Sequence, residues 1–329
     1  MLIGEVFYYV LNMSIMAVLV IFVLFFLRVI AKKWFSKSMV FILWSFVIFR
    51  LLIPISIPSS FSILNFFDVT LIRNVPVKTT IPLIEENISY SFSNIIQQAE
   101  SYTPITYETP TIGNLFNILG SIWITGIIIF FTVLIILWLN VNKQLCKIPC
   151  NDYNNLLAVT SNKLKVFPKI QCFYSDFLNT PIVAGIIAPK IILPYGLDDS
   201  LTKYIFLHEI CHIKRQDNLW KLLFLLTACI HWFNPFVWLM VTISIRDIEL
   251  ACDEKVLRNI EDESRKDYAE ALLSFSEKPT KLSTAFGNNK LRKRIESIIE
   301  YQRISTYMGI IMVVVWSICG IILITNSSL

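Results

Sequence analysis

Residues 208–212 read His208-Glu209-Ile210-Cys211-His212, and they hold two of the three histidines in this 329-residue chain. On a helix, side chains at positions i and i+4 lie on one face, so both imidazoles can bind the same zinc ion. Glu209 would then lie beside the metal, where it can take a proton from water. The stretch therefore predicts a helical zinc site with Glu209 as general base. The alternative is a buried helix with incidental histidines.

A later acidic segment carries the candidate third ligand. A hydrolytic zinc site uses three protein ligands and keeps one position open. Glu249 and Asp253 lie at i and i+4, on one face of the predicted helix. We expect Glu249 to complete the set for one zinc per chain, and Asp253 to accept a hydrogen bond from the ring of His208 or His212. Asp247 is the rival ligand, and a solvated acidic face is the structural alternative.

The composition indicates a membrane protein. Hydrophobic residues make up 55% of the chain, and the mean hydropathy of +0.62 is too high for an ordinary soluble domain. Four stretches are apolar and long enough to cross a bilayer. They lie at about 6–27, 39–57, 115–139 and 307–324.

Basic residues orient these spans. The connection after the first span holds Arg28, Lys32, Lys33 and Lys37 and no acid, which places it in the cytoplasm by the positive-inside rule. The N-terminus is then outside the cell. Because much of the net charge of +5 is explained by this sorting, we expect no direct binding of nucleic acid.

This orientation divides the chain into five parts. Two transmembrane helices occupy 1–57, an extracellular loop 58–114 and a third span 115–139. A cytoplasmic zinc peptidase domain occupies 140–306. The last span and a short outer tail occupy 307–329.

The apolar segment 219–245 is predicted not to cross the membrane. If it did, the histidines and Glu249 would lie on opposite sides. Asn234 and Pro235 sit at its middle, proline breaks a helix, and each half is too short to span a bilayer. We expect a helical hairpin with its turn at 233–235, dipping into or lying on the inner leaflet. His231, near the turn, is then structural or interfacial rather than a fourth ligand.

Short strands are expected before the histidine helix. Segments 169–174, 181–187 and 189–194 have strand composition, and the prolines around them suit edge strands. An exposed edge can pair with an extended peptide, although a purely structural sheet is an equal alternative. The candidate substrate-binding residues are Ile182, Val183, Ala184 and Gly185.

Together these motifs resemble those of the integral-membrane zinc peptidases of the β-lactam sensor-transducer, or antirepressor, family. The resemblance covers nearly the whole chain and rests on four segments in order: 181–191, 208–217, 232–238 and 246–253. It implies that His208, His212 and Glu249 are zinc ligands and that Glu209 is the general base.

The resemblance also implies a fold and a function. We expect a mostly α-helical membrane protein with about four transmembrane helices, a cytoplasmic α+β gluzincin-like zinc peptidase domain and the membrane-associated hairpin. The implied enzyme works at the inner face of the lipid bilayer. An outside signal activates it, and it then cleaves itself and brings about cleavage of a cytoplasmic winged-helix transcriptional repressor. Two other functions stay open: a non-catalytic signalling protein with structural zinc, and a quality-control membrane protease.

The chain departs from the family at its end. Full-length sensors continue after the fourth span into an extracellular penicillin-binding domain, whereas this chain stops at Leu329. The expectation is therefore a peptidase transducer that works with a separate sensor protein.

Three further features follow from the resemblance or lie near it. The candidate self-cleavage bond joins Ala285 to Phe286, in a polar loop after the catalytic helices. Tyr268 could stabilise an oxyanion or pack between helices, so the oxyanion donor stays unassigned. A basic run at 290–294 is interpreted as either a solvated juxtamembrane face or a docking site.

Overall fold

The computed structural model describes residues 3–31, 36–53, 58–59, 110–145, 148–166, 170–274, 286–302, 314 and 326–327. The predicted fourth span lies outside these residues apart from Val314, and so does most of the predicted outer loop. Ala285 also lies outside the described residues.

The described chain is mostly helical, with a small sheet. Its α-helices are α1 (Ile3–Ala31), α2 (Lys37–Leu52), α5 (Pro110–Gln144), α6 (Asn154–Leu164), α7 (Asp199–Arg215), α8 (Asp217–Ile230), α9 (Pro235–Leu257), α10 (Arg265–Ser274) and α11 (Phe286–Ile299). A 3₁₀ turn, Asp262–Ser264, precedes α10.

Two helices of the described chain, α1 and α5, are long and apolar enough to cross a bilayer. They coincide with the predicted first and third spans. The predicted second span corresponds to α2, which has only 16 residues, fewer than the roughly 20 that a typical bilayer needs. The starts of α1 and α5 meet, since the backbone N–H of Gly4 donates to Asn117 Oδ1 at 3.1 Å.

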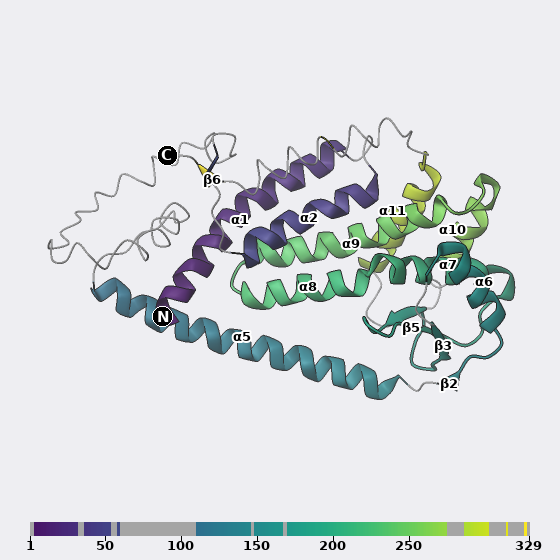
Figure 1. Ribbon diagram of the computed structural model, residues 1–329, viewed down its shortest axis with the longest axis horizontal. Coiled ribbons are helices and arrows are strands. Elements are labelled where there is room, and N and C mark those ends of the chain that lie inside the picture. Colours follow the sequence, from purple (N-terminus) through teal and green to yellow (C-terminus); the bar gives the residue numbers. More distant parts are fainter. Residues whose placement is uncertain are drawn as a thin grey trace.

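The segment 219–245 folds as the predicted helical hairpin, from α8 through a turn into α9. Asn234 caps α9 by accepting a hydrogen bond from the N–H of Phe236 at 2.9 Å, and Pro235 fills the first helical position, where its missing N–H costs nothing. The amide of Asn234 also donates to Ser14 Oγ, midway along α1, at 2.7 Å. The hairpin tip therefore reaches well along the N-terminal helices, and Figure 1 shows α8 and α9 lying beside α1 and α2.

His231 lies at this tip, far from the other two histidines along α8. It is fully buried, and its Nε2 is 3.0 Å from the carbonyl oxygen of Leu51, at the end of α2. Its contacts in the structure are those of a packing residue.

The sheet has four strands: β2 (Ile148–Pro149), β3 (Gln171–Tyr174), β4 (Ile182–Ala184) and β5 (Lys190–Leu193). Their order is β2-β3-β5-β4, with β3 and β5 parallel and the other pairs antiparallel. β4 lies at the edge, as expected for a substrate strand. β3 and β5 were also expected at an edge but are internal, because each pairs with a strand on both sides. Ile191, Ile192 and Leu193 of β5 are fully buried. A two-residue parallel pair joins β1 (Pro58–Ser59) to β6 (Asn326–Ser327).

Two apolar cores meet at α9. One core packs α6, α7, α10 and α11 with the sheet, and it includes Cys252 and Val256 of α9. The other packs α1, α2 and α8, and it includes Ile248 and Ala251 of α9. Helix α9 therefore ties the N-terminal helices to the part of the chain that carries the histidines.

Candidate metal centre

Helix α7 presents the predicted zinc-binding residues on its buried side. The helix starts at an N-cap, Asp198, whose Oδ1 accepts from the N–H of Ser200 at 2.9 Å. His208, Glu209 and His212 are all buried. The helix therefore presents both imidazoles and the predicted general base to the interior.

Three ligand atoms converge between α7 and α9. Nε2 of His208 and Nε2 of His212 are 3.1 Å apart. Oε2 of Glu249 lies 3.7 Å from the first and 3.6 Å from the second. Tetrahedral ligands at about 2.0–2.2 Å from one zinc ion are roughly 3.3–3.5 Å apart. The two nitrogens and the oxygen therefore fit a single zinc ion with little movement.

Cys252 is another candidate ligand near the two histidines. His208, His212 and Cys252 can each offer a ligand atom, and these atoms lie within 4.8 Å of one another. However, the Cys252 sulfur lies 3.6 Å from Nδ1 of His208, on the other edge of the ring from Nε2. Burial also raises the pKa of this thiol well above its usual value, which opposes the thiolate that zinc binds. The geometry favours Glu249.

The other ring nitrogen of each histidine, Nδ1, is hydrogen-bonded by a further set of residues. Nδ1–H of His212 donates to Oδ2 of Asp217 at 2.6 Å. Nδ1–H of His208 donates to the hydroxyl of Tyr268 at 2.9 Å, and that hydroxyl donates to Asp253 Oδ1 at 2.5 Å. Because Nδ1 is engaged on both rings, Nε2 is the nitrogen that each ring directs to a metal, which is how such partners fix the ring orientation.

Two of these partners differ from the sequence expectation. Asp253 lies 3.5 Å from Nδ1 of His208, so its short hydrogen bond goes to Tyr268 rather than to the ring. Asp217 was not assigned at all. It reaches His212 because Gln216 adopts a left-handed conformation, with φ 55°, and turns the chain sharply from α7 into α8.

The charges around the site favour a cation. Burial lowers the pKa of His212, but the charge of Glu249, the hydrogen bond to Asp217 and the charge of Glu209 outweigh it and raise the pKa to about 10. Burial raises the pKa of Glu249, but the nearby histidines and Arg294 hold it well below its usual value. The carboxylate is therefore ionised at neutral pH and ready to bind metal.

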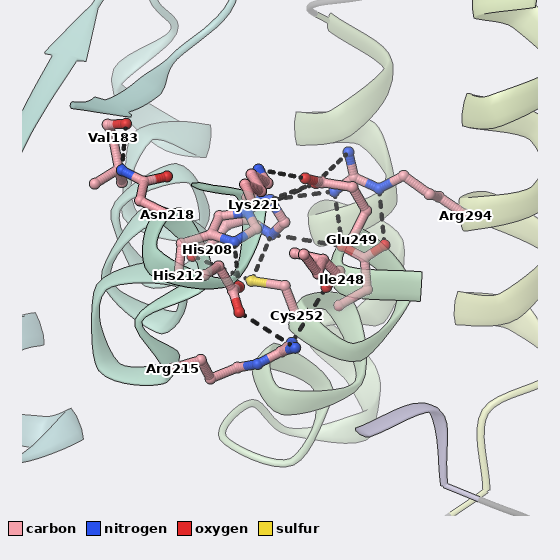
Figure 2. A network of polar contacts seen from close by, with 12 residues as sticks. Val183, His208, His212, Arg215, Asn218, Lys221, Ile248, Glu249, Cys252 and Arg294 are labelled. Atoms are coloured by element: carbon pink, nitrogen blue, oxygen red, sulfur yellow. Dashed lines mark hydrogen bonds and ion pairs between the residues drawn. The ribbon is translucent and has the colours of Figure 1, made fainter. Parts of the chain in front are cut away.

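Two cations flank Glu249 (Figure 2). Lys221 Nζ lies 3.2 Å from Oε1 of Glu249, the oxygen turned away from the histidines. Arg294 Nη1 lies 3.7 Å from Oε2, and the Arg294 guanidinium also pairs with Asp253. Arg294 was expected on a solvated or docking face. The structure instead leaves its side chain only 18% exposed, because α11 packs against α9 and α10.

A cavity of about 530 Å³ opens onto this centre. His208, Glu209, His212 and Glu249 line one part of it. Of the four predicted strand residues, Ile182 and Val183 line the cavity, whereas Ala184 pairs with Lys190 of β5. Gly185 follows β4 with φ +90°, a conformation that favours glycine. The remaining lining residues are Thr180, Pro181, Tyr204, Ile205, Asn218, Lys221, Tyr268, Ala271, Leu272, Leu291 and Arg294.

The candidate cleavage residues are less completely placed. Ala285 is outside the described residues. Phe286 is the first residue of α11, so the predicted bond lies at the start of the helix that carries Arg294.

Comparison with known proteins places these motifs in a family. The family described as BlaR1 peptidase M56 matches residues 8–301. The methicillin resistance mecR1 protein of Staphylococcus aureus is 26% identical over 269 residues, which cover 80% of this chain and 45% of the relative. The regulatory protein BlaR1 of the same organism is 27% identical over 270 residues, covering 79% and 44%.

Another organism supplies a third relative. The regulatory protein BlaR1 of Bacillus licheniformis is 26% identical over 203 residues, covering 56% of this chain and 33% of the relative. The chain thus spans less than half the length of the curated relatives it matches.

Proposed function

The chain belongs to the BlaR1 peptidase M56 family, and from that premise we propose that it is a membrane-embedded zinc endopeptidase acting in signal transduction. We propose that it cleaves itself and a cytoplasmic protein, with a winged-helix transcriptional repressor as the expected substrate class. The relatives are described as regulatory and methicillin-resistance proteins, which supports a signalling role.

The proposed metal ligands are His208, His212 and Glu249. Their donor set, two imidazoles and one carboxylate, is that of a catalytic rather than a closed structural zinc site. Among the described cavity-lining residues, Glu209 is the remaining carboxylate. Zinc, when bound, would supply the Lewis acidity that activates water and polarises the substrate carbonyl.

The remaining chemistry belongs to Glu209. Its carboxylate takes a proton from the attacking water and passes it to the leaving nitrogen. Asp217 and the Tyr268–Asp253 pair keep the two imidazoles in the orientation in which Nε2 faces the cavity. Lys221 holds the outer oxygen of Glu249 and directs the inner oxygen toward the histidines.

The proposed substrate lies extended along β4. Ile182 and Val183 line the cavity beside the metal centre, and within the described residues β4 has a strand partner on one side only. The amide of Asn218 donates to the carbonyl oxygens of Val183 and Gly185, both at 3.0 Å. A bound peptide would compete with this amide for the outer edge of the strand.

The proposed topology has four spans, with the N-terminus outside and the peptidase part in the cytoplasm. The starts of α1 and α5 meet, as this topology requires, because both would lie at the outer face. The hairpin would enter from the cytoplasmic side, since its open end carries the metal centre.

The observation that carries the proposal is the convergence of the two Nε2 atoms and the Glu249 oxygen on a cavity that Glu209 also lines. The test uses the full chain in lipid nanodiscs and measures zinc content and self-cleavage. Wild type should hold one zinc. Glu209→Gln should keep the zinc and lose cleavage at least 100-fold, whereas Glu249→Ala should lose the zinc.

The exposed Glu270→Gln change is the matched control, because it removes a carboxylate on α10 away from the cavity. Full zinc occupancy in Glu249→Ala would overturn the ligand set, and unchanged cleavage by Glu209→Gln would overturn the mechanism. Proteins that accumulate in Glu209→Gln cells then distinguish the rival roles. A single repressor supports signalling, whereas many unrelated proteins indicate quality control.

A further inference from the structure

Arg294 is held inside the metal centre from a distant part of the chain. Its Nε donates to Asp253 Oδ2 at 2.8 Å and its Nη2 to Asp253 Oδ1 at 2.7 Å. Two parallel bonds of this kind fix the plane of a guanidinium as well as its position. The Arg294 side chain is only 18% exposed, and the Asp253 carboxylate also accepts from Tyr268.

The guanidinium presents its remaining donors to the point where the candidate ligands meet (Figure 2). Nη2 lies 3.3 Å from Nε2 of His208. Nη1, which Asp253 does not use, lies 3.7 Å from Oε2 of Glu249. Leu291, one turn earlier on α11, lines the same cavity. Helix α11 therefore forms one wall of the cavity and supplies a cation at its metal-binding end.

Two other donors beside the candidate ligands, Tyr268 and Lys221, are already engaged. The Tyr268 hydroxyl bonds to Nδ1 of His208 and to Asp253, on the ring edge opposite the metal-binding nitrogen. That tyrosine is fully buried and cannot turn its hydroxyl to a substrate without breaking both bonds. Lys221 binds the outer oxygen of Glu249. Among the described cavity-lining residues, Arg294 is left as the rigidly held donor beside the candidate ligands.

We propose that Arg294 donates a hydrogen bond from Nη1 to the carbonyl oxygen of the scissile peptide as negative charge develops on it. Asp253 is then a positioning residue, because it orients the guanidinium. This inference rests on the proposed peptidase function.

The reaction itself stays that of peptide hydrolysis. The water oxygen bonds to the carbonyl carbon, the water proton passes through Glu209 to the leaving nitrogen, and the carbon–nitrogen bond breaks. Arg294 keeps its protons throughout. A preorganised donor to a developing oxyanion typically contributes 10²–10³-fold to the rate constant.

The test compares Arg294→Ala and Arg294→Lys in the full chain in nanodiscs. The control is Arg292→Ala on the same helix, whose side chain is 78% exposed and pairs with Glu296. Five quantities are measured: zinc content, kcat and KM on a peptide substrate, affinity for a phosphonamidate peptide that mimics the tetrahedral oxyanion, and affinity for the matching amide peptide in a Glu209→Gln background.

We expect Arg294→Ala to keep its zinc and its amide-peptide affinity within about threefold. It should lose about 10²–10³-fold in kcat and a similar factor in phosphonamidate affinity. Arg294→Lys should recover part of both losses. Arg292→Ala should match wild type.

Equal weakening of both peptides, or loss of zinc, would overturn the proposal and make Arg294 a structural residue. Because Arg294→Ala leaves a buried carboxylate unpaired, a doubly neutral variant, Arg294→Met with Asp253→Asn, keeps the test decisive if the single variant unfolds. It should keep its affinity for the amide peptide and lose about 10²–10³-fold in affinity for the phosphonamidate. If wild type itself holds no zinc and cleaves nothing, the proposed function fails. If wild type is active and Arg294→Ala is unchanged, only this inference fails.

Discussion

Asp247 and Glu249 are two residues apart on α9, yet they bind opposite halves of the molecule. Asp247 accepts from Arg28 Nε on α1 at 2.8 Å and from Trp44 Nε1 on α2 at 2.9 Å. Glu249 faces the two histidines of α7. Side chains two positions apart on a helix point about 200° away from each other. The rotation of α9 that satisfies Asp247 is therefore the rotation that directs Glu249 to the metal centre.

A second attachment lies further along α9. Glu254 accepts from the hydroxyl of Ser36 and from the N–H of Ser38, both at 2.9 Å. Both serines lie at the start of α2. These contacts join α1 and α2 to the helix that carries Glu249, so we expect a movement of either helix to reach the metal ligands.

Breaking the Arg28–Asp247 pair should weaken the metal centre from a distance. Arg28→Met leaves the buried Asp247 carboxylate uncompensated, at a cost of about 3–5 kcal/mol in unfolding free energy. We expect zinc affinity to fall about tenfold or more, although Arg28 touches no ligand. Competition with a fluorescent zinc chelator measures this.

The matching double variant, Arg28→Met with Asp247→Asn, should recover much of both losses because no charge is left unpaired. Lys143→Met, which removes an exposed cation at the end of α5, serves as the control. Unchanged zinc affinity in Arg28→Met would show that α9 keeps its rotation without the Arg28–Asp247 pair.

Lys221 should matter to metal binding without being a ligand. Its ammonium group holds Oε1 of Glu249, so Lys221→Met frees the carboxylate to rotate. Loss of such an outer partner typically costs 10–100-fold in metal affinity, and we expect a decrease in that range. Lys266→Met, at an exposed position on α10, is the matched control. Wild-type affinity in Lys221→Met would contradict this role and leave Glu249 oriented by its other contacts.

Zinc binding should release a proton and strengthen with pH. The pKa of His212 is raised to about 10 in the metal-free protein, so its ring carries an extra proton at pH 7 that must leave before Nε2 can bind metal. Below pH 10, apparent affinity should therefore rise about tenfold per pH unit, and it should level off above that value. Calorimetry in buffers of different ionisation enthalpy counts the released proton.

Asp217→Asn provides the internal comparison. It replaces the charged acceptor that raises the pKa of His212 with a neutral one, so fewer protons should be released at pH 8 than in wild type. Equal release from both proteins would mean that Asp217 does not hold the proton on this ring.

The parts of the site that local sequence could predict are those that a helix or a turn specifies by itself. The spacing of His208 and His212 requires only a helix, and Asn234-Pro235 is a local signal for the hairpin that the structure contains. The prediction of Glu249 as the third ligand followed from that hairpin, because it brings the chain back to α7. These inferences needed no knowledge of how distant elements pack.

Arg294 and Asp217 were beyond such reasoning for two physical reasons. Arg294 lies in a basic run whose composition equally suits a solvated face, and only the packing of α11 on α9 and α10 separates it from the exposed Arg292. Asp217 reaches His212 through a left-handed Gln216, a conformation that non-glycine residues seldom adopt and that this sequence does not signal. The packing of α11 decided the position of Arg294, and the backbone conformation of Gln216 decided that of Asp217.

Self-cleavage between Ala285 and Phe286 should leave Arg294 on the smaller, C-terminal fragment. Phe286 begins α11, and Gly287 in its first turn weakens the helix, so this turn can open to present an extended backbone. The rest of α11 is held by the Arg294–Asp253 pair and by Ile298, which is only 1% exposed. We therefore expect the two fragments to copurify in mild detergent and to keep peptidase activity.

If Arg294 acts on the substrate, separating the fragments should abolish that activity while the larger fragment keeps its zinc, because the candidate ligands all precede the cut. N-terminal sequencing should find a fragment that starts at Phe286 in wild type, and no such fragment in Glu209→Gln. A different start would place the cut elsewhere, and a fragment in both proteins would assign it to another protease. Full activity of the isolated larger fragment would show that α11 is dispensable, and cleavage would then release the enzyme from its last helix rather than remove part of its active site.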